Sequence, residues 1–155
     1  MFTCTAQKFS NLLFFSSVAC LFLVLVGCGD GRGKRVPVAG VVKIDGVPVA
    51  HGSVTFFPVN PGEKSRPGGA SLDENGRFQV TSYEPNDGLI IGNYEVTVMA
   101  IEPINGASQR WHAPQKYSVR TSSGLTQEIT KESNEIEVNL TWEGDKHSKP
   151  FVEKM

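Results

Sequence analysis

Cysteine is scarce in this sequence of 155 residues, and its placement limits what it can do. Cys4 and Cys20 lie in the first 27 residues, which include an apolar segment, and Cys28 is the third and last cysteine. If the first two are removed with that segment, no pair of thiols remains to form an internal disulfide. The folded part is therefore expected to depend on its hydrophobic core, without covalent crosslinks.

The sequence also lacks an excess of charge of one sign. Its 15 Lys and Arg residues and 16 Asp and Glu residues give a formal net charge of −1, which becomes −2 if Lys8 is removed. Domains that bind nucleic acid carry a basic stripe or patch. The chain has no such stripe, so nucleic acid is not an expected partner.

A hydrophobic run long enough to span a bilayer is missing as well. The apolar run covers residues 12–26 and follows Lys8, the one basic residue ahead of it. A spanning helix needs roughly 20 apolar residues. A basic start before a shorter apolar core is typical of a secretory signal. We therefore predict that residues 1–27 are a signal peptide and that the chain is exported.

The end of the apolar run carries a specific motif. Leu25-Val26-Gly27-Cys28 resembles the lipobox of bacterial lipoprotein precursors. The small Gly27 gives the signal peptidase access to the bond, and the thiol of Cys28 forms a thioether with diacylglycerol. The resemblance implies a mature chain that begins at lipidated Cys28, on the periplasmic or extracellular face of the envelope. The alternative is an ordinary secreted protein in which Cys28 is fortuitous.

The mature chain divides into three parts. The glycine-rich residues 28–35 are expected to be a flexible tether. Residues 36–143 contain short runs of period-two alternation separated by turn signals, and no helical periodicity of useful length. This pattern predicts an all-β fold, an antiparallel Greek-key sandwich of about seven strands. The polar residues 144–155 are expected to be a disordered tail whose removal leaves stability unchanged.

Three motifs resemble carboxypeptidase regulatory-like domains, which are transthyretin-like sandwiches related to collagen-adhesin B repeats. The motifs are Asp45-Gly46-Val47-Pro48 between two strands, Asp73-Glu74-Asn75-Gly76-Arg77-Phe78 in a hairpin turn, and Gly92-Asn93-Tyr94-Glu95-Val96-Thr97-Val98 in a long strand. Tyr94 after Gly92 resembles a tyrosine corner, in which the hydroxyl caps a connecting loop. The resemblance implies the sandwich fold and says little about function, because this fold hosts many unrelated roles.

Candidate residues for catalysis or metal binding are sparse. His51 lies in a turn, His112 in a long loop (residues 102–114) and His147 in the tail, none with a second ligand at metal spacing. No set of acids, bases and nucleophiles is recognisable. We therefore expect no enzyme activity, no metal and no cofactor.

The likeness to collagen-adhesin B repeats raises one covalent alternative, an isopeptide bond between Lys43 and Asn139. Such bonds join the first and last strands and require a buried acid beside them. Alternation turns Lys43 and Asn139 outward, and Val98 occupies the place of the helper acid. An isopeptide-stabilised adhesin-type domain is therefore only the second alternative.

Three residues are candidates for a binding surface. Arg110 and Trp111 lie in the long loop, where an indole and a guanidinium could grip a sugar or a protein. Trp111 could equally fold back to cover the core. Phe57 points out of its strand and marks a contact patch or lies under the loop of residues 60–69. The function expected from the sequence is a non-catalytic, lipid-anchored binding or structural module whose partner is an envelope protein, with carbohydrate binding as the first alternative.

Overall fold

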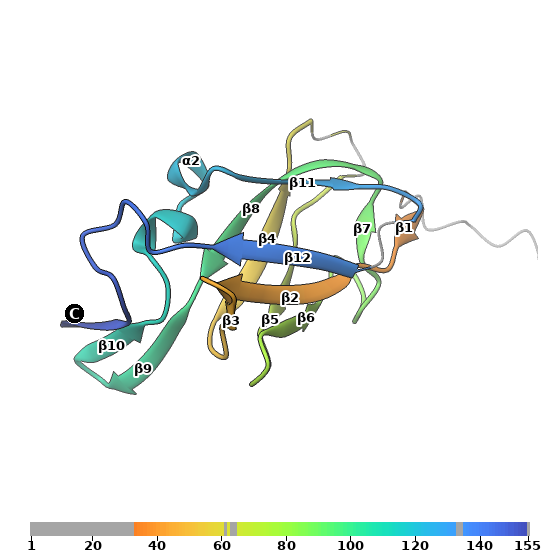
Figure 1. Cartoon of the computed structure of the whole chain (residues 1–155). Helices are drawn as coiled ribbons and strands as arrows, with labels where there is room; N and C mark the ends of the chain where they lie inside the picture. The colour runs from red at the N-terminus through yellow and green to blue at the C-terminus, as the bar shows by residue number, and fades with distance from the viewer. Residues whose placement is uncertain (1–32, 61, 63–64, 133–134, 155) are drawn as a thin grey trace, which may run out of the picture. The chain divides into compact units, whose positions relative to one another are not determined.

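The computed structural model describes residues 33–60, 62, 65–132 and 135–154 (Figure 1). The predicted signal peptide, the lipobox and most of the predicted tether lie outside this range. The elements in chain order are β1 (Arg35–Val36), β2 (Ala39–Ile44), β3 (Val47–Pro48), β4 (Ser53–Pro58), β5 (Gly68–Ser71), β6 (Arg77–Gln79), β7 (Leu89–Ile90), β8 (Gly92–Met99), β9 (Ile101–Asn105), β10 (Ser108–Trp111), η2 (Gln115–Ser118), α2 (Arg120–Ser123), β11 (Leu125–Ile129), β12 (Glu135–Leu140) and β13 (Phe151–Lys154). The predicted all-β fold is confirmed.

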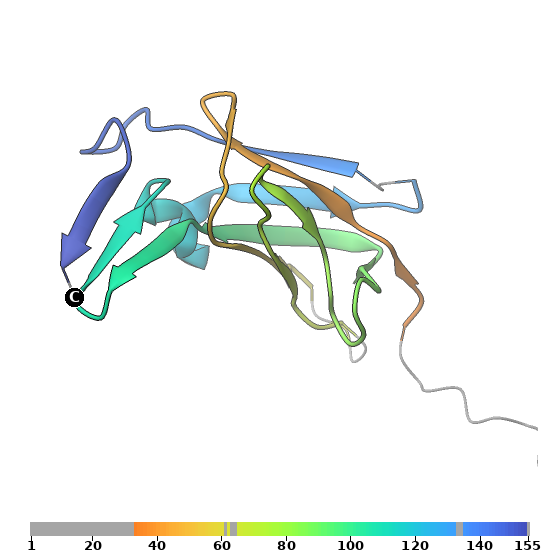
Figure 2. The ribbon, with the colours of Figure 1, turned by 90° about the horizontal axis from the view of Figure 1, so that it is seen from below.

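Two four-stranded sheets form the sandwich. One has the strand order β11-β8-β4-β5, and in the other β2 pairs with β12 on one side and with β3 and β6 on the other. Figure 2 shows them as two layers, with β2 and β12 in one and β8 and β11 in the other. Inward residues of both sheets fill the space between them. The core includes Val38, Val42, Val54, Phe56, Phe78, Val80, Tyr94, Val96, Val98, Ile136, Val138 and Leu140.

The alternation read from the sequence matches the observed faces. In β2 and β4 every second side chain is buried, and in β12 the buried residues are Ile136, Val138 and Leu140. The turn between β2 and β3 also matches, since Asp45 and Gly46 have φ values of 46° and 83°. Two consecutive positive φ values are what a two-residue type I′ hairpin requires.

Two features of the topology differ from the prediction. Strand β12 runs parallel to β2 over six residues, so the second sheet is not wholly antiparallel. The hairpin expected around residues 73–76 has its turn, with Gly76 at φ 70°, but β5 pairs with β4 and β6 pairs with β2. An isolated antiparallel bridge, Gly69↔Thr81, also links the two arms of the expected hairpin. The turn therefore joins the two layers.

A third sheet occupies the segments predicted as a long loop and a disordered tail. Strands β9 and β10 form a hairpin within residues 101–111, and β13 pairs with β10 from Trp111↔Phe151 to Ser108↔Lys154. Aromatic contacts hold the tail in place. The ring of His147 stacks on that of Phe151 with centroids 3.6 Å apart, and Phe151 packs edge-on against Trp142 with centroids 6.4 Å apart. Both predictions, of a loop and of a disordered tail, are therefore wrong.

The N-terminal boundary of the folded part also shifts. Arg35, the last residue of the predicted tether, lies in β1, which pairs with β7. Its guanidinium is 2.8 Å from the Asp87 carboxylate, and both side chains are more than four-fifths buried. Burial opposes the charge of Asp87, but backbone N–H groups of Ser82, Glu84 and Tyr83, together with Arg35, outweigh it and lower the pKa of Asp87. The folded part therefore includes Arg35.

Tyr94 behaves as the tyrosine corner predicts. Its side chain is 2% exposed, and its hydroxyl donates a 2.8 Å hydrogen bond to the carbonyl of Ile90, four residues earlier. Burial raises the pKa of the phenol. The bond fixes the connection between β7 and β8 against the core.

Within the part of the chain that the structure describes, no helix is long and apolar enough to cross a membrane.

Candidate functional site

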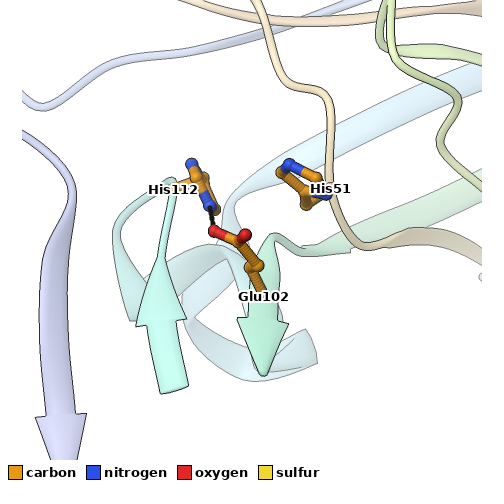
Figure 3. A group of neighbouring side chains, drawn as sticks. All are labelled: His51, Glu102 and His112. Carbon is orange, nitrogen blue, oxygen red and sulfur yellow. Dashed lines mark hydrogen bonds and ion pairs between the residues drawn. The ribbon is translucent and has the colours of Figure 1, made fainter. Parts of the chain in front are cut away.

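Two histidines and a glutamate meet at one end of the sandwich. The ligand atoms of His51, Glu102 and His112 all lie within 4.8 Å of one another (Figure 3). His112 Nε2 is 3.0 Å from Glu102 Oε2, and the imidazole rings of His51 and His112 are 5.0 Å apart between centroids. We call these three residues the His–Glu–His cluster.

The position of His51 follows from the start of β4. Ser53 pairs with Met99 of β8, so the chain just before β4 runs alongside the junction of β8 and β9. Gly52 makes this approach possible, because its φ is 118° and a Cβ there would be 2.1 Å from the carbonyl oxygen of Met99. His51 therefore lies exposed beside the beginning of β9.

The other two residues are positioned by the hairpin of β9 and β10. Glu102 is the register partner of Arg110, and Trp111 is the partner of Ile101. The backbone N–H of His112 donates to the carbonyl of Ala100 at 2.8 Å, which continues this pairing by one residue. Glu102 and His112 thus lie on neighbouring strands, and both side chains are partly buried.

Glu102 is the electrostatic centre of the cluster. The pKa of its carboxyl is lowered, mainly by the hydrogen bond from His112. Partial desolvation acts in the opposite direction and raises the pKa, and the positive charge of Arg110 lowers it further. Arg110 Nη1 is 3.1 Å from the same oxygen, Oε2, that His112 contacts. The carboxylate is therefore ionised at neutral pH and available as an anionic ligand.

Two imidazole nitrogens and one carboxylate oxygen are donors that Zn²⁺ and related transition metals accept. Spacing along the chain gives no histidine a second ligand, so the sequence did not predict this cluster. Here His51 approaches Glu102 and His112 across two strand pairings. The site could have been predicted by recognising that β9 and β10 form a hairpin. That hairpin places Glu102 beside the residue that follows the second strand, His112.

Comparison with known proteins assigns no family. No family model matches the chain, and no curated protein matches it. Among solved structures it resembles the 1.80 Å crystal structure of a DUF3823 family protein from Parabacteroides merdae ATCC 43184, with 17% sequence identity and a TM-score of 0.40. The match covers 71% of this chain and 46% of that one, so this chain spans less than half of that protein's length.

Trp111, proposed as a binding residue, is covered. Only 8% of it is exposed, and its indole N–H donates to Glu153 Oε2 of β13 at 2.8 Å. Gln109 and Gln115 donate to the same oxygen at 3.2 and 2.9 Å. Trp111 therefore packs within the molecule, as expected if it folds back to cover the core. It offers no open face on which a sugar ring could stack. Arg110 beside it contacts Glu102.

Phe57, the other candidate contact residue, is half-buried on the outer face of β4. The guanidinium of Arg120 lies over its ring, 5.2 Å from the centroid. Arg120 also contacts Glu95 of β8 and lies 3.5 Å from the carbonyl of Pro58. The side chain that covers Phe57 is thus Arg120 of α2.

The structure brings the residues of the isopeptide alternative together. Lys43 and Asn139 are register partners in the parallel pair of β2 and β12, and both side chains face outward as predicted. The carboxylate between them is Glu137, which accepts hydrogen bonds from Lys43 and Asn139. The pKa of the Glu137 carboxyl is lowered, mainly by the hydrogen bond from Lys43. Glu137 is half exposed and its carboxyl is held in the charged form, whereas the crosslink needs a buried, protonated acid.

Proposed function

We propose that this chain is a lipid-anchored module of a bacterial envelope, tethered through Cys28, which binds another envelope component and catalyses no reaction. The observation that carries the proposal is the Leu25-Val26-Gly27-Cys28 motif directly after a short apolar run. A likeness to carboxypeptidase regulatory-like domains remains part of the proposal. The buried hydroxyl of Tyr94 and the turn at Asp45 and Gly46 agree with it.

The distance between anchor and fold supports this arrangement. Six residues, 29–34, separate Cys28 from β1, so the Cα atoms of Cys28 and Arg35 can be at most ~25 Å apart. The salt bridge between Arg35 and Asp87 fixes β1 to the domain at the end where β7 lies. A lipid on Cys28 would therefore keep β1 close to the membrane surface.

The opposite end of the domain lies farther from the proposed anchor than β1 does. Strands β9, β10 and β13 lie at the far end from β1 in both views of the fold (Figures 1 and 2). The His–Glu–His cluster belongs to this end. A partner in the envelope would meet these three strands before it reached the anchored end.

The binding partner that we favour is a protein. The glycan alternative depended on an exposed indole, and Trp111 is buried against Glu153. Sugar-binding sites use open aromatic faces on which a pyranose ring can stack. Retention of the protein on a polysaccharide column, lost in Trp111→Ala while the fold survives, would restore the glycan alternative.

Crosslinking in native membranes tests the proposal. The protein should be found in the membrane fraction, should move to the soluble fraction when Cys28 is replaced by alanine, and should crosslink to one protein in fixed stoichiometry. Asp30→Ala is the matched control, since it changes a neighbouring residue and keeps the thiol. Membrane attachment that survives Cys28→Ala would contradict the anchoring. Turnover of an ester, peptide or glycoside by the pure protein would contradict the non-catalytic role.

A further inference from the structure

We propose that His51, Glu102 and His112 bind one divalent transition-metal ion, with Zn²⁺ the best match to the donors. This site is separate from the proposed lipid anchor at Cys28 and from the pair Lys43 and Asn139. It is built from three segments: the connection between β3 and β4, strand β9, and the residue after β10. The inference does not depend on the lipid anchor.

The spacing of the donors fits a zinc ion after a small rearrangement. Zn–N and Zn–O bonds of about 2.0–2.1 Å in a tetrahedron place ligand atoms about 3.3 Å apart. Glu102 Oε2 and His112 Nε2 are 3.0 Å apart, which is already close to that spacing. The third donor lies within 4.8 Å of both. An approach of about 1.5 Å is within reach of rotation about the side-chain bonds of an exposed histidine.

The chemistry of the donors points to a metal of the zinc class. Ca²⁺ and Mg²⁺ take six or more oxygen ligands, whereas this cluster offers two nitrogens and one carboxylate. Imidazole suits zinc and its neighbours in the first transition row. Three protein ligands leave a fourth position for water or for a donor from a partner, because His51 faces solvent.

Arg110 competes with the metal for Glu102. Its guanidinium contacts the carboxylate oxygen that also accepts from His112. A bound cation would displace this contact, and the exposed Arg110 side chain can turn into solvent. Replacing Arg110 should therefore tighten metal binding, whereas replacing a ligand should weaken it. A purely structural network of hydrogen bonds would not give these opposite directions.

The test is a zinc titration of the full-length lipoprotein in detergent, made without a histidine tag and stripped with a chelator. Calorimetry should show one Zn²⁺ per chain. His51→Gln should weaken binding by at least about 100-fold, more than the roughly 10- to 100-fold loss caused by removing an outer-shell partner. His51 is exposed, so this variant keeps its fold, and circular dichroism checks that it does.

Further variants sharpen the result. Glu102→Gln and His112→Gln should weaken binding to the same extent as His51→Gln. Arg110→Gln should tighten it about two- to fivefold, the fold-change that matches a surface ion pair. His147→Gln is the control, since it removes a histidine outside the cluster and should leave the affinity unchanged.

The outcomes separate this site from the proposed anchoring. Cys28→Ala should bind zinc as the wild type does, so a failure of anchoring would leave the metal site intact. Absence of stoichiometric zinc binding by the wild type would overturn the proposal. Equal affinity in the wild type and His51→Gln, or weaker binding in Arg110→Gln, would overturn it as well.

Discussion

At the scale of single residues, Glu153 of β13 links the C-terminal strand to the hairpin of β9 and β10. One of its oxygens accepts hydrogen bonds from Trp111, Gln115 and Gln109, and these donors, named in order of effect, lower the pKa of its carboxyl. The ionised carboxylate of Glu153 is the form that accepts the hydrogen bond from the indole N–H of Trp111. Glu153 therefore couples the C-terminal strand to Trp111, and this coupling depends on pH.

Acid should weaken the molecule through Glu153. Because the pKa in the folded state lies below the ordinary value of 4.5, the stabilisation is complete above that pH and is lost as the pH falls through the lowered pKa. The free energy of unfolding of the wild type and of Glu153→Gln should differ at pH 7, and the difference should shrink as the pH falls below 4.5. A difference that stays constant over this range would contradict the role given to the carboxylate.

The phenol of Tyr94 provides a second test at this scale. Tyr94→Phe removes the hydrogen bond to Ile90 and keeps the packed ring, so it should lower the free energy of unfolding by about 0.5–1.5 kcal/mol. Denaturant unfolding measures the change, and the circular dichroism spectrum should be that of the wild type. An unchanged unfolding midpoint would mean that the corner contributes nothing to stability.

At the scale of elements, the strands that the sequence predicted are those of the sandwich core. In β8, Tyr94, Val96 and Val98 alternate with more polar residues because one face of the strand packs against the opposite sheet. The same argument located β2, β4 and β12. Alternation is a signature of one-sided burial, and it identifies a strand only where such burial occurs.

The third sheet escaped prediction for the same physical reason. Strand β9 has no buried residue and contains Pro103, while β13 has partly buried and exposed residues only. Strand β9 adds no residue to the core and β13 adds only Phe151 at its edge, so neither segment carries the run of alternating apolar residues that reveals a strand. The His–Glu–His cluster was missed with them, because His51 and His112 approach each other only when the hairpin of β9 and β10 is formed.

Strand β13 gives a direct test of the revised view of the tail. Ending the chain after Pro150 removes four backbone pairings with β10 and uncovers Trp111. The truncated protein should melt at a lower temperature than the wild type, and its tryptophan emission should shift to the red. Ending the chain after Lys154 is the control. An unchanged melting temperature would support the disordered tail that the sequence suggested.

At the scale of the whole molecule, the two ends of the sandwich have separate roles in our account. The end with β1 lies a few residues from the proposed lipid, and the end with β9, β10 and β13 carries the His–Glu–His cluster. Anchoring at one end and recognition at the other would let the domain present its distal strands to the envelope. This division explains why the anchor and the metal site can be tested independently.

The central claim is the lipid on Cys28, and the intact mass of the protein extracted from membranes tests it most directly. We predict a mass equal to residues 28–155 plus a diacylglyceryl group and any further acyl chain. Loss of one ammonia from this mass would additionally report a bond between Lys43 and Asn139, which we do not expect. A chain that retains residues 1–27, or one that begins elsewhere with Cys28 unmodified, would contradict the account.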